Sequence, residues 1–346
     1  MRLTANEVFP KGNRRFKSSR LRYGNKTKLF WGFMLQVSYD NLPQSLVTEL
    51  ERLGGDKLTL VSDISDSDVH ISIDPRLRSR NDNKTIAIYS EPRSIRPDLY
   101  KKSRRKNFLG EIANSPERAT KLGLVNWIPL PTLSIKAGVW PTSRIPRSCM
   151  VVGHKFSASK DSNYALRRKV IKLDEGKDNK IDVYGVDWLD PLWLQAQRRI
   201  HAARVQLKDV AKFSIRELTS EYFLAPCNYK GVMKSDLSTI SKYETAVIIE
   251  NESDYISEKV WNCLAWGTVP IYVGPKLNDF ALLKSLVIEV EPDPQTITKL
   301  VSKVSAKEIG KKRERIRKLR DEITIERECE QAATRLIQLI LEITSK

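Results

Sequence analysis

Apolar and polar positions along the first 130 residues predict short buried strands separated by helices. Runs rich in β-branched residues, bounded by polar turns, are typical of strands. Strands are expected at 58–61, 69–73, 85–89 and 125–129. Apolar residues at helical spacing, ended by Gly54-Gly55, predict a helix at 42–53, and a second helix is expected at 106–122. This half of the chain therefore has an alternating α/β pattern.

The second half repeats the alternation and ends in a long helical tail. Strands are expected at 149–152, 181–184, 246–249, 269–273 and 286–290. Helices are expected at 163–173, 213–223, 255–266 and 294–304, and the tail at 306–343 is helical with an interruption at Gly310. Strands that alternate with helices favour parallel sheets, so the pattern predicts two α/β domains.

Domain boundaries follow from shifts in composition along the 346 residues. The stretch before 148 contains Pro141 and Pro146 and few apolar repeats, which is typical of a linker. We expect a basic leader at 1–28, an N-terminal α/β domain at 29–140, a linker at 141–147, a C-terminal α/β domain at 148–305 and a C-terminal helix at 306–346.

The chain is strongly basic, with 60 Lys and Arg against 42 Asp and Glu. Three clusters carry much of this charge, at 11–28, 101–106 and 311–320. Such a field attracts polyanions or anionic lipid, although each cluster is equally well read as a solvated surface. No RNP-like strand, zinc knuckle or helix-turn-helix pattern accompanies the charge, which argues against nucleic acid as the partner.

Membrane and redox signals are weak in this sequence. No run of about eighteen apolar residues is present, and the first residues have no apolar core of a secretory signal. The four cysteines have no paired spacing that predicts disulfides or a zinc site. We expect a cytoplasmic protein, with peripheral contact to the cytoplasmic face of the membrane through its basic segments.

One window, residues 245–275, carries the sharpest functional signal. It predicts a strand, a polar loop, a helix stopped by Gly267 and a second strand, which is the size of one βαβ unit. Ligands of open α/β sheets bind beyond the carboxyl ends of strands, where residues 250–258 would lie. Lys259 falls in the first turns of the helix, whose free N–H groups favour an anion. A ligand with hydroxyls and phosphates, such as a sugar nucleotide, fits this arrangement.

The same window resembles the donor-binding signature of the α-1,3-fucosyltransferases, glycosyltransferase family 10. The residues in register with that signature are Glu250, Asn251, Tyr255, Glu258, Lys259, Gly267, Pro270 and Gly274. The spacer after Asn251 is about two residues shorter than in the family, and Glu244 stands where the family has a lysine. Residues 149–185 and 85–92 are similar to other family segments.

The resemblance implies a GT-B architecture, with two Rossmann-like domains facing across a cleft. The domain at 29–140 would be the acceptor side, and the domain at 148–305 would bind the nucleotide sugar. It implies an inverting transfer of fucose from GDP-fucose to a hydroxyl of an oligosaccharide or lipid-linked glycan. Glu91, at the end of the strand at 85–89, matches the family's catalytic glutamate and would act as the base. A turn carboxylate ahead of Pro92 is the plainer interpretation of the same residue.

The remaining family roles fall mainly on the donor side. Lys259 would bind the diphosphate and Glu258 the ribose, with Tyr255 beside them, while Glu250 and Asn251 would orient the donor or cap the helix. The family's phosphate-binding arginine has no counterpart in 221–234. We expect its role to be taken by Lys230, Lys234, Arg167 or Arg168.

No metal or other cofactor is expected. The Asp66-Ser67-Asp68 triplet matches a metal-binding pattern but is better read as a loop, and the three histidines are far apart in sequence. Two alternatives remain open: the same fold with another nucleotide sugar, and a non-catalytic protein that binds polyanions or membranes.

Overall fold

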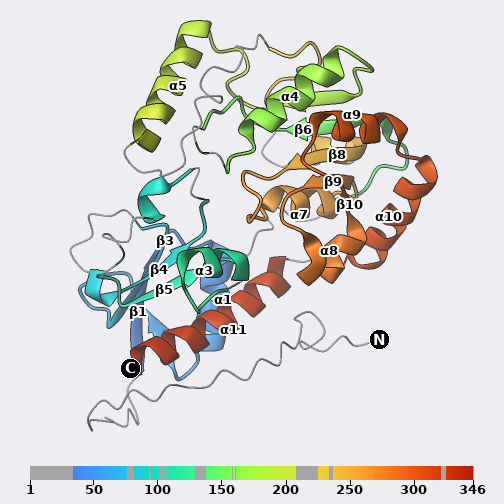
Figure 1. Ribbon diagram of the computed structural model, residues 1–346. Helices are drawn as coiled ribbons and strands as arrows, with labels where there is room; N and C mark the ends of the chain where they lie inside the picture. The colour runs from blue at the N-terminus through green and yellow to red at the C-terminus, as the bar shows by residue number, and fades with distance from the viewer. Residues whose placement is uncertain are drawn as a thin grey trace.

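The computed structural model describes residues 34–75, 82–92, 95–100, 105, 107–128, 138–157, 159, 161–207, 225–233, 237–320 and 325–345. The leader predicted at 1–28 and the helix predicted at 213–223 lie outside these residues. The described part forms two α/β domains, one after the other along the chain (Figure 1).

The first domain is built on a five-stranded parallel sheet with the order β2-β1-β3-β4-β5. Its strands are β1 Leu35–Asp40, β2 Leu58–Leu60, β3 Val69–Ile73, β4 Thr85–Tyr89 and β5 Gly110–Ala113. Every residue of β3 and β4 is buried, as expected for parallel strands covered on both faces.

Helices α1 (Gln44–Gly54) and α3 (Pro116–Leu122) belong to the two separate apolar clusters of this domain. Two short 3₁₀ turns, Asp82–Lys84 and Pro97–Tyr100, also lie in this domain. Another, Ser238–Lys242, precedes β8 of the second domain. Helix α3 begins where the Ser115 hydroxyl accepts the Arg118 N–H at 3.2 Å, with Pro116 in its first turn. It ends at Gly123, whose positive φ of 68° suits glycine. These signals hold α3 directly behind the end of β5.

The second domain has another five-stranded parallel sheet, in the order β10-β9-β8-β6-β7. Its strands are β6 Ile145–Val151, β7 Ile181–Tyr184, β8 Tyr243–Ile249, β9 Val269–Val273 and β10 Ile288–Glu289. Strands β8 and β9 are the two predicted in the signature window, so the βαβ prediction is confirmed there.

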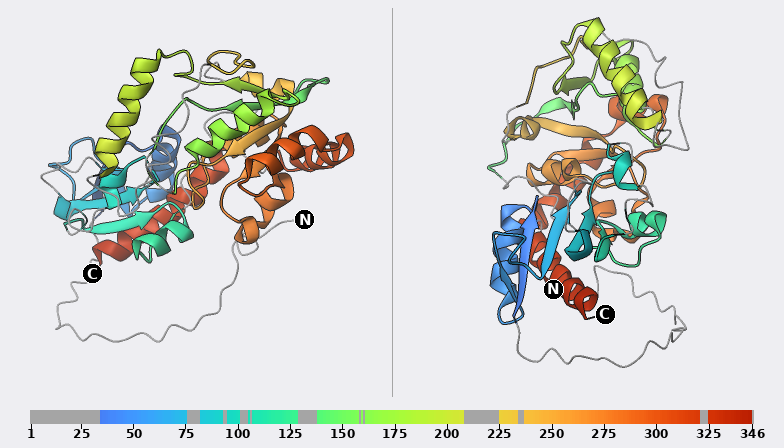
Figure 2. Two further views of the ribbon diagram at one scale, coloured as in Figure 1. Left: turned by 45° about the horizontal axis from the view of Figure 1, so that its top comes forward. Right: turned by 90° about the vertical axis from the view of Figure 1, so that its left-hand side faces the viewer.

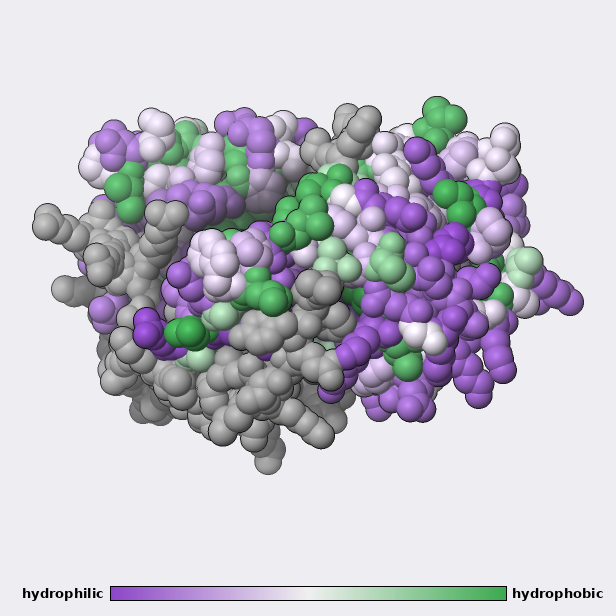
Figure 3. Space-filling model, turned by 90° about the horizontal axis from the view of Figure 1, so that it is seen from above, coloured by the Kyte–Doolittle hydropathy of each residue, from purple (hydrophilic) through white to green (hydrophobic). Residues whose placement is uncertain are grey.

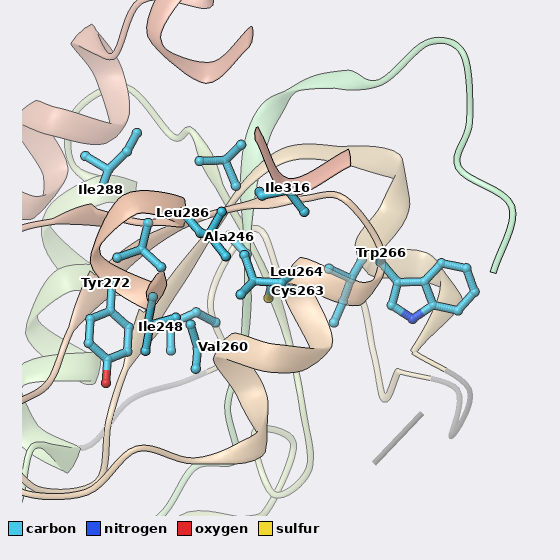
Figure 4. Close-up of a cluster of buried hydrophobic side chains, with 14 of the residues drawn as sticks. Ala246, Ile248, Val260, Cys263, Leu264, Trp266, Tyr272, Leu286, Ile288 and Ile316 are labelled. Carbon is cyan, nitrogen blue, oxygen red and sulfur yellow. The ribbon is translucent and has the colours of Figure 1, made fainter. Parts of the chain in front are cut away.

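Helices cover both faces of the second sheet. They are α4 Tyr164–Glu175, α5 Leu192–Leu207, α7 Glu258–Ala265, α8 Ala281–Leu286, α9 Pro294–Lys303 and α10 Ala306–Lys318, with a 3₁₀ turn at Leu277–Asp279. Helices α4 and α9 contribute to one apolar cluster. Helices α7, α8 and α10 contribute to the other, in which Val260, Leu264 and Ile316 gather around β8 and β9 (Figure 4).

The C-terminal helix α11 (Ile325–Thr344) returns to the first domain and packs beside α1 (Figures 1 and 2). Its buried face includes Leu336, Leu339 and Ile340, none of which is exposed. The expected break at Gly310 is wrong, because Gly310 lies inside α10 with open space around it, and a single glycine costs a helix only about 1 kcal/mol. The tail thus joins both domains through two helices.

The two passages of the chain between the domains lie side by side. Arg320, just after α10, donates from Nη2 to the Gly138 carbonyl at 2.9 Å, and its guanidinium carbon lies 5.6 Å from the centre of the Trp140 ring. Trp140 in turn donates from Nε1 to the Ala265 carbonyl at 2.9 Å. Residues 138–140, just before the segment predicted as a linker, are therefore fixed to the second domain, and β6 begins within that segment at Ile145.

Two other sequence expectations are wrong: the strand expected at 125–129 is reduced to an isolated bridge at Trp127, and the helix expected at 106–122 begins only at Pro116. Residues 110–113, predicted as helix, form β5, because they pair with β4 at the edge of the sheet. Helix α5 was not predicted at all, since its apolar residues do not form one buried stripe: Trp193 and Ile200 are 62% and 52% exposed. In the space-filling view, hydrophobic side chains are scattered among hydrophilic ones on the face seen from above (Figure 3).

Candidate functional site

Glu91 directly follows β4, and the backbone at this point is held by side chains from three neighbouring segments. Asp74, which follows β3, accepts the Ser90 N–H at 2.9 Å and the Glu91 N–H at 3.1 Å, and also the Ser90 hydroxyl. Asn114 and Arg118 donate to the Ser90 carbonyl at 3.2 and 2.6 Å. The hydrogen bonds of the sheet end with β4 at Tyr89, and these side-chain bonds take their place. They fix the direction of the Glu91 side chain.

The Glu91 carboxyl is half-buried, and burial raises its pKa above the ordinary value. The nearby charges of Asp74 and Glu258 raise this pKa further, while Arg118 and Lys259 lower it. Glu258 and Lys259 belong to the second domain. Arg118, which binds the Ser90 carbonyl next to Glu91, also lies over the Tyr255 ring in the loop before α7, so the carboxyl ends of the two sheets meet there.

Glu250 ends β8 and is completely buried. Its Oε1 accepts the Ser257 N–H at 2.9 Å, which closes the loop between β8 and α7, and burial raises the pKa of its carboxyl. The Asn251 amide oxygen accepts from Arg167 Nη2 at 2.8 Å. Arg167 Nε also donates to the Ile249 carbonyl at 2.9 Å. These hydrogen bonds hold the loop between β8 and α7 in place through Glu250, Asn251 and Arg167.

Helix α7 begins at Glu258, with Ser257 as its N-cap, rather than at Tyr255 as the sequence predicted. The Ser257 hydroxyl accepts the Lys259 N–H at 3.4 Å, and Lys259 Nζ lies 3.4 Å from the same hydroxyl. Burial and the neighbouring Arg167 lower the pKa of the Lys259 amine, whereas Glu250 and Glu258 raise it. The amine is thus shielded among charged groups at a helix N-terminus instead of extending into bulk solvent.

The loop before α7 contacts α3 of the first domain. The Arg118 guanidinium carbon lies 5.0 Å from the centre of the Tyr255 ring. Lys121 Nζ forms an ion pair with Asp254 at 2.8 Å. Tyr255 is partly buried, and this burial raises the pKa of its hydroxyl well above the ordinary value. These contacts hold the first domain against the loop between β8 and α7. They bring Tyr255, Glu91, Glu258 and Lys259 into one region.

Lys230, another predicted phosphate ligand, is not brought to this region. Lys230 lies beside β7, and its Nζ is 4.0 Å from Asp182, a residue that also accepts from Arg147 and from Tyr243 at the start of β8. That position is toward the amino ends of the strands, away from Lys259. Lys234 lies outside the described residues. Arg168 donates to the Lys155 carbonyl at 2.6 Å.

The Asp66-Ser67-Asp68 triplet is a structural loop at the start of β3. Asp68 accepts the Gln36 N–H at 2.9 Å, and the Ser67 hydroxyl bonds to Ser38 and to the Ile64 carbonyl. Among the described residues, no group of three or more His, Cys, Asp or Glu side chains is arranged to hold a metal ion. The same part of the chain contains no helix long and apolar enough to cross a membrane.

Part of the third basic cluster is used internally. Arg313 donates to the Gly267 and Glu244 carbonyls at 3.3 and 3.2 Å, and Lys312 donates to the Ser285 carbonyl at 3.1 Å. Arg317 pairs with Glu314 at 2.9 Å. These cations stabilise the packing of α10 on the second domain, so the cluster is not simply a free basic surface.

Sequence reasoning missed Asp74, Asn114 and Arg118. The first two directly follow β3 and β5, the strands on either side of β4 in the sheet. The rule that polar groups gather at carboxyl strand ends would have found them, had β5 been recognised. Arg118 gave no such signal, because it lies inside a helix, where an arginine is usually solvated.

Comparisons with known proteins identify no family. No family model matches the chain, and no curated protein matches it in sequence. Among solved structures, the chain is similar to TarM, with 12% identity over 80% of this chain and 55% of that one and a TM-score of 0.47. It thus spans little more than half the length of TarM.

Two further solved structures are similar over nearly their whole length. One is the DNA-modifying enzyme β-glucosyltransferase, whose structure was determined with and without uridine diphosphoglucose. It has 13% identity over 88% of this chain and all of that one, with a TM-score of 0.49. The other is a glycosyltransferase from Rickettsia africae, with 9% identity over 90% and 98% and a TM-score of 0.44. At these identities and TM-scores, support for a function lies in this chain's own residues. The two-domain α/β prediction with a C-terminal helix is confirmed by the two parallel sheets and α11.

Proposed function

We propose that the protein is an inverting glycosyltransferase that uses a nucleotide sugar. The observation that carries this proposal is the contact between the end of β4 and the loop before α7, in which Arg118 binds the Ser90 carbonyl next to Glu91 and lies over the Tyr255 ring, three residues before Glu258. A half-buried carboxyl with a raised pKa and a shielded ammonium at a helix N-terminus are the two groups that such a transfer requires.

In the proposed reaction the Glu91 carboxylate accepts the proton of an acceptor hydroxyl while its oxygen attacks the anomeric carbon. The bond from that carbon to the diphosphate oxygen breaks, and the nucleoside diphosphate leaves with the electron pair. Lys259 and the free N–H groups at the start of α7 stabilise the leaving charge. Glu258 accepts hydrogen bonds from the ribose. The single displacement inverts the anomeric configuration without an enzymatic nucleophile.

The donor that we propose is GDP-fucose, and the acceptor is a hydroxyl of an oligosaccharide or lipid-linked glycan. The register of Tyr255, Glu258 and Lys259 with the fucosyltransferase signature supports this choice. The absence of an arginine from 221–234 and the shorter spacer favour the alternative of another nucleotide sugar. A thermal-shift panel of GDP-, UDP- and CMP-sugars distinguishes the two, because only the true donor class stabilises the folded protein strongly.

The test of the site is donor-dependent release of the nucleoside diphosphate by the wild type and by Glu91→Gln and Lys259→Ala. We expect each variant to lose more than about tenfold in turnover, which corresponds to roughly 1.4 kcal/mol of transition-state stabilisation. Glu51→Gln and Lys169→Ala change exposed residues of the same types and should keep full turnover. Retention of wild-type turnover by both site variants would refute the assignment.

The rival function is non-catalytic binding of polyanions or membranes, which the net charge of +18 favours. It predicts salt-sensitive binding to anionic vesicles and no affinity for nucleoside diphosphates. The same preparation, titrated with GDP and with vesicles that contain phosphatidylserine, separates the two functions.

A further inference from the structure

Arg118 is a buried cation whose hydrogen bonding is incomplete. The side chain is 1% exposed, so its charge has almost no contact with water. Nη1 donates to the Ser90 carbonyl at 2.6 Å. Nε and Nη2 have no hydrogen-bond partner among the described residues. A buried ionised group with unused donors is costly, and such groups are normally paired.

The two unused donors form a recognisable pair. In a guanidinium group the Nε–H and the neighbouring Nη2–H point in the same direction along one edge of the plane. This edge is the fork with which arginine binds two oxygens of one phosphate or carboxylate. The face of the guanidinium is taken by the Tyr255 ring and Nη1 by Ser90, so the fork is the part of the group that remains for a ligand.

The position of Arg118 indicates which oxyanion it would bind. Arg118 binds the Ser90 carbonyl next to Glu91, and both Arg118 and Lys259 lower the pKa of the Glu91 carboxyl. Tyr255, under the guanidinium, is three residues before Glu258 at the start of α7. An anion bound at that helix start would therefore lie near the fork as well.

We propose that Arg118 is the second cation of the donor site and binds a phosphate oxygen pair of the nucleotide sugar through Nε and Nη2. The inference rests on the proposed function, and it supplies from the first domain the arginine that the second domain lacks at 221–234. Arg118 then links phosphate binding to the position of the base, because the same guanidinium also binds the Ser90 carbonyl next to Glu91. Binding of the phosphate would fix the base and bring the two domains together.

The experiment is a calorimetric titration of the full chain with inorganic pyrophosphate, GDP, UDP and guanosine, the last of which has no phosphate. Wild type, Arg118→Lys and Arg118→Gln are compared, with Lys169→Ala as control. We expect both Arg118 variants to bind pyrophosphate and the matching nucleotide at least tenfold more weakly. Guanosine should bind equally to all four proteins. Lysine does not rescue, since it has no fork.

The outcomes separate this inference from the proposed function. If wild type binds a nucleoside diphosphate and both variants bind it equally well, Arg118 has only a structural role and the inference fails alone. If pyrophosphate binds through Arg118 but no nucleotide adds affinity, Arg118 is an oxyanion ligand, but the nucleotide-sugar proposal fails and Arg118 is not part of a donor site. If wild type binds none of the four, both fail. Should the variants not fold, a crystal structure of wild type with pyrophosphate decides, since its oxygens must lie within hydrogen-bond distance of Nε and Nη2.

Discussion

Asp74 offers the most informative perturbation of the site, because it acts on Glu91 in two separable ways. Its carboxylate accepts from the Ser90 N–H, the Glu91 N–H and the Ser90 hydroxyl, and its charge raises the pKa of the Glu91 carboxyl. Asp74 has a φ of 49°, which Asn and Gly tolerate. Asp74→Asn therefore removes the charge and keeps most of the geometry, whereas Asp74→Gly removes both.

The expected magnitudes follow from the three donors. A hydrogen bond to a charged group contributes about 1.5–3 kcal/mol, but Ser90 and Glu91 are only partly buried, so water replaces some of the loss. We expect Asp74→Gly to lower the free energy of unfolding by about 2–4 kcal/mol and Asp74→Asn by about 1 kcal/mol. Turnover should fall in the glycine variant much more than in the asparagine variant, because the base loses its fixed direction.

The pH dependence gives the second readout. Glu91 must be ionised to accept a proton, so activity falls as the pH drops through its pKa. Removal of the like charge in Asp74→Asn lowers that pKa, and the acid limb of the kcat/KM profile should move to lower pH. Urea unfolding and pH–rate profiles, with Asp56→Asn as an exposed control, measure both effects. If the acid limb of Asp74→Asn does not move and Asp74→Gly is as stable as wild type, the proposed action of Asp74 on Glu91 is refuted.

Two further predictions concern stability. Burial raises the pKa of Glu91 in the folded protein above its ordinary value of 4.5, so the ionised form is disfavoured by folding. Stability is then lost as the pH rises through that raised pKa, and Glu91→Gln should be more stable than wild type at pH 7 but not at pH 4; equal stability at both, measured by urea unfolding, would contradict the burial of this carboxyl. Leu336→Ala in α11 should destabilise the first domain by about 2–5 kcal/mol, because Leu336 is fully buried there. Hydrogen exchange of β3 and β4 reports this loss, and unchanged protection would show that α11 is dispensable.

The sequence predicted the strands at 69–73, 85–89, 181–184 and 269–273 with the bounds that the structure has. These strands are short apolar runs buried on both faces, so composition alone marks their ends. β5 escaped recognition because GEIA has one β-branched residue and depends on pairing with β4. Local patterns cannot reveal a strand that exists through its neighbour.

The site was predictable where chain position decides it. The rule on helix starts indicated Lys259 as an anion ligand, whereas Glu91 and Glu258 were assigned through the resemblance to the fucosyltransferase signature. Arg118 was not predictable, since its burial results from the docking of α3 on the Tyr255 loop. Lys230 was chosen by proximity in sequence to the family pattern, yet its partner Asp182 holds it toward the other end of the sheet.

The contact between Arg320 and the Gly138 carbonyl has a mechanical consequence. Because residues 138–140 and Arg320 belong to the two segments of chain that connect the domains, this hydrogen bond holds the two connections together at one place. Substitution of Arg320 would then leave the two segments to connect the domains independently of each other.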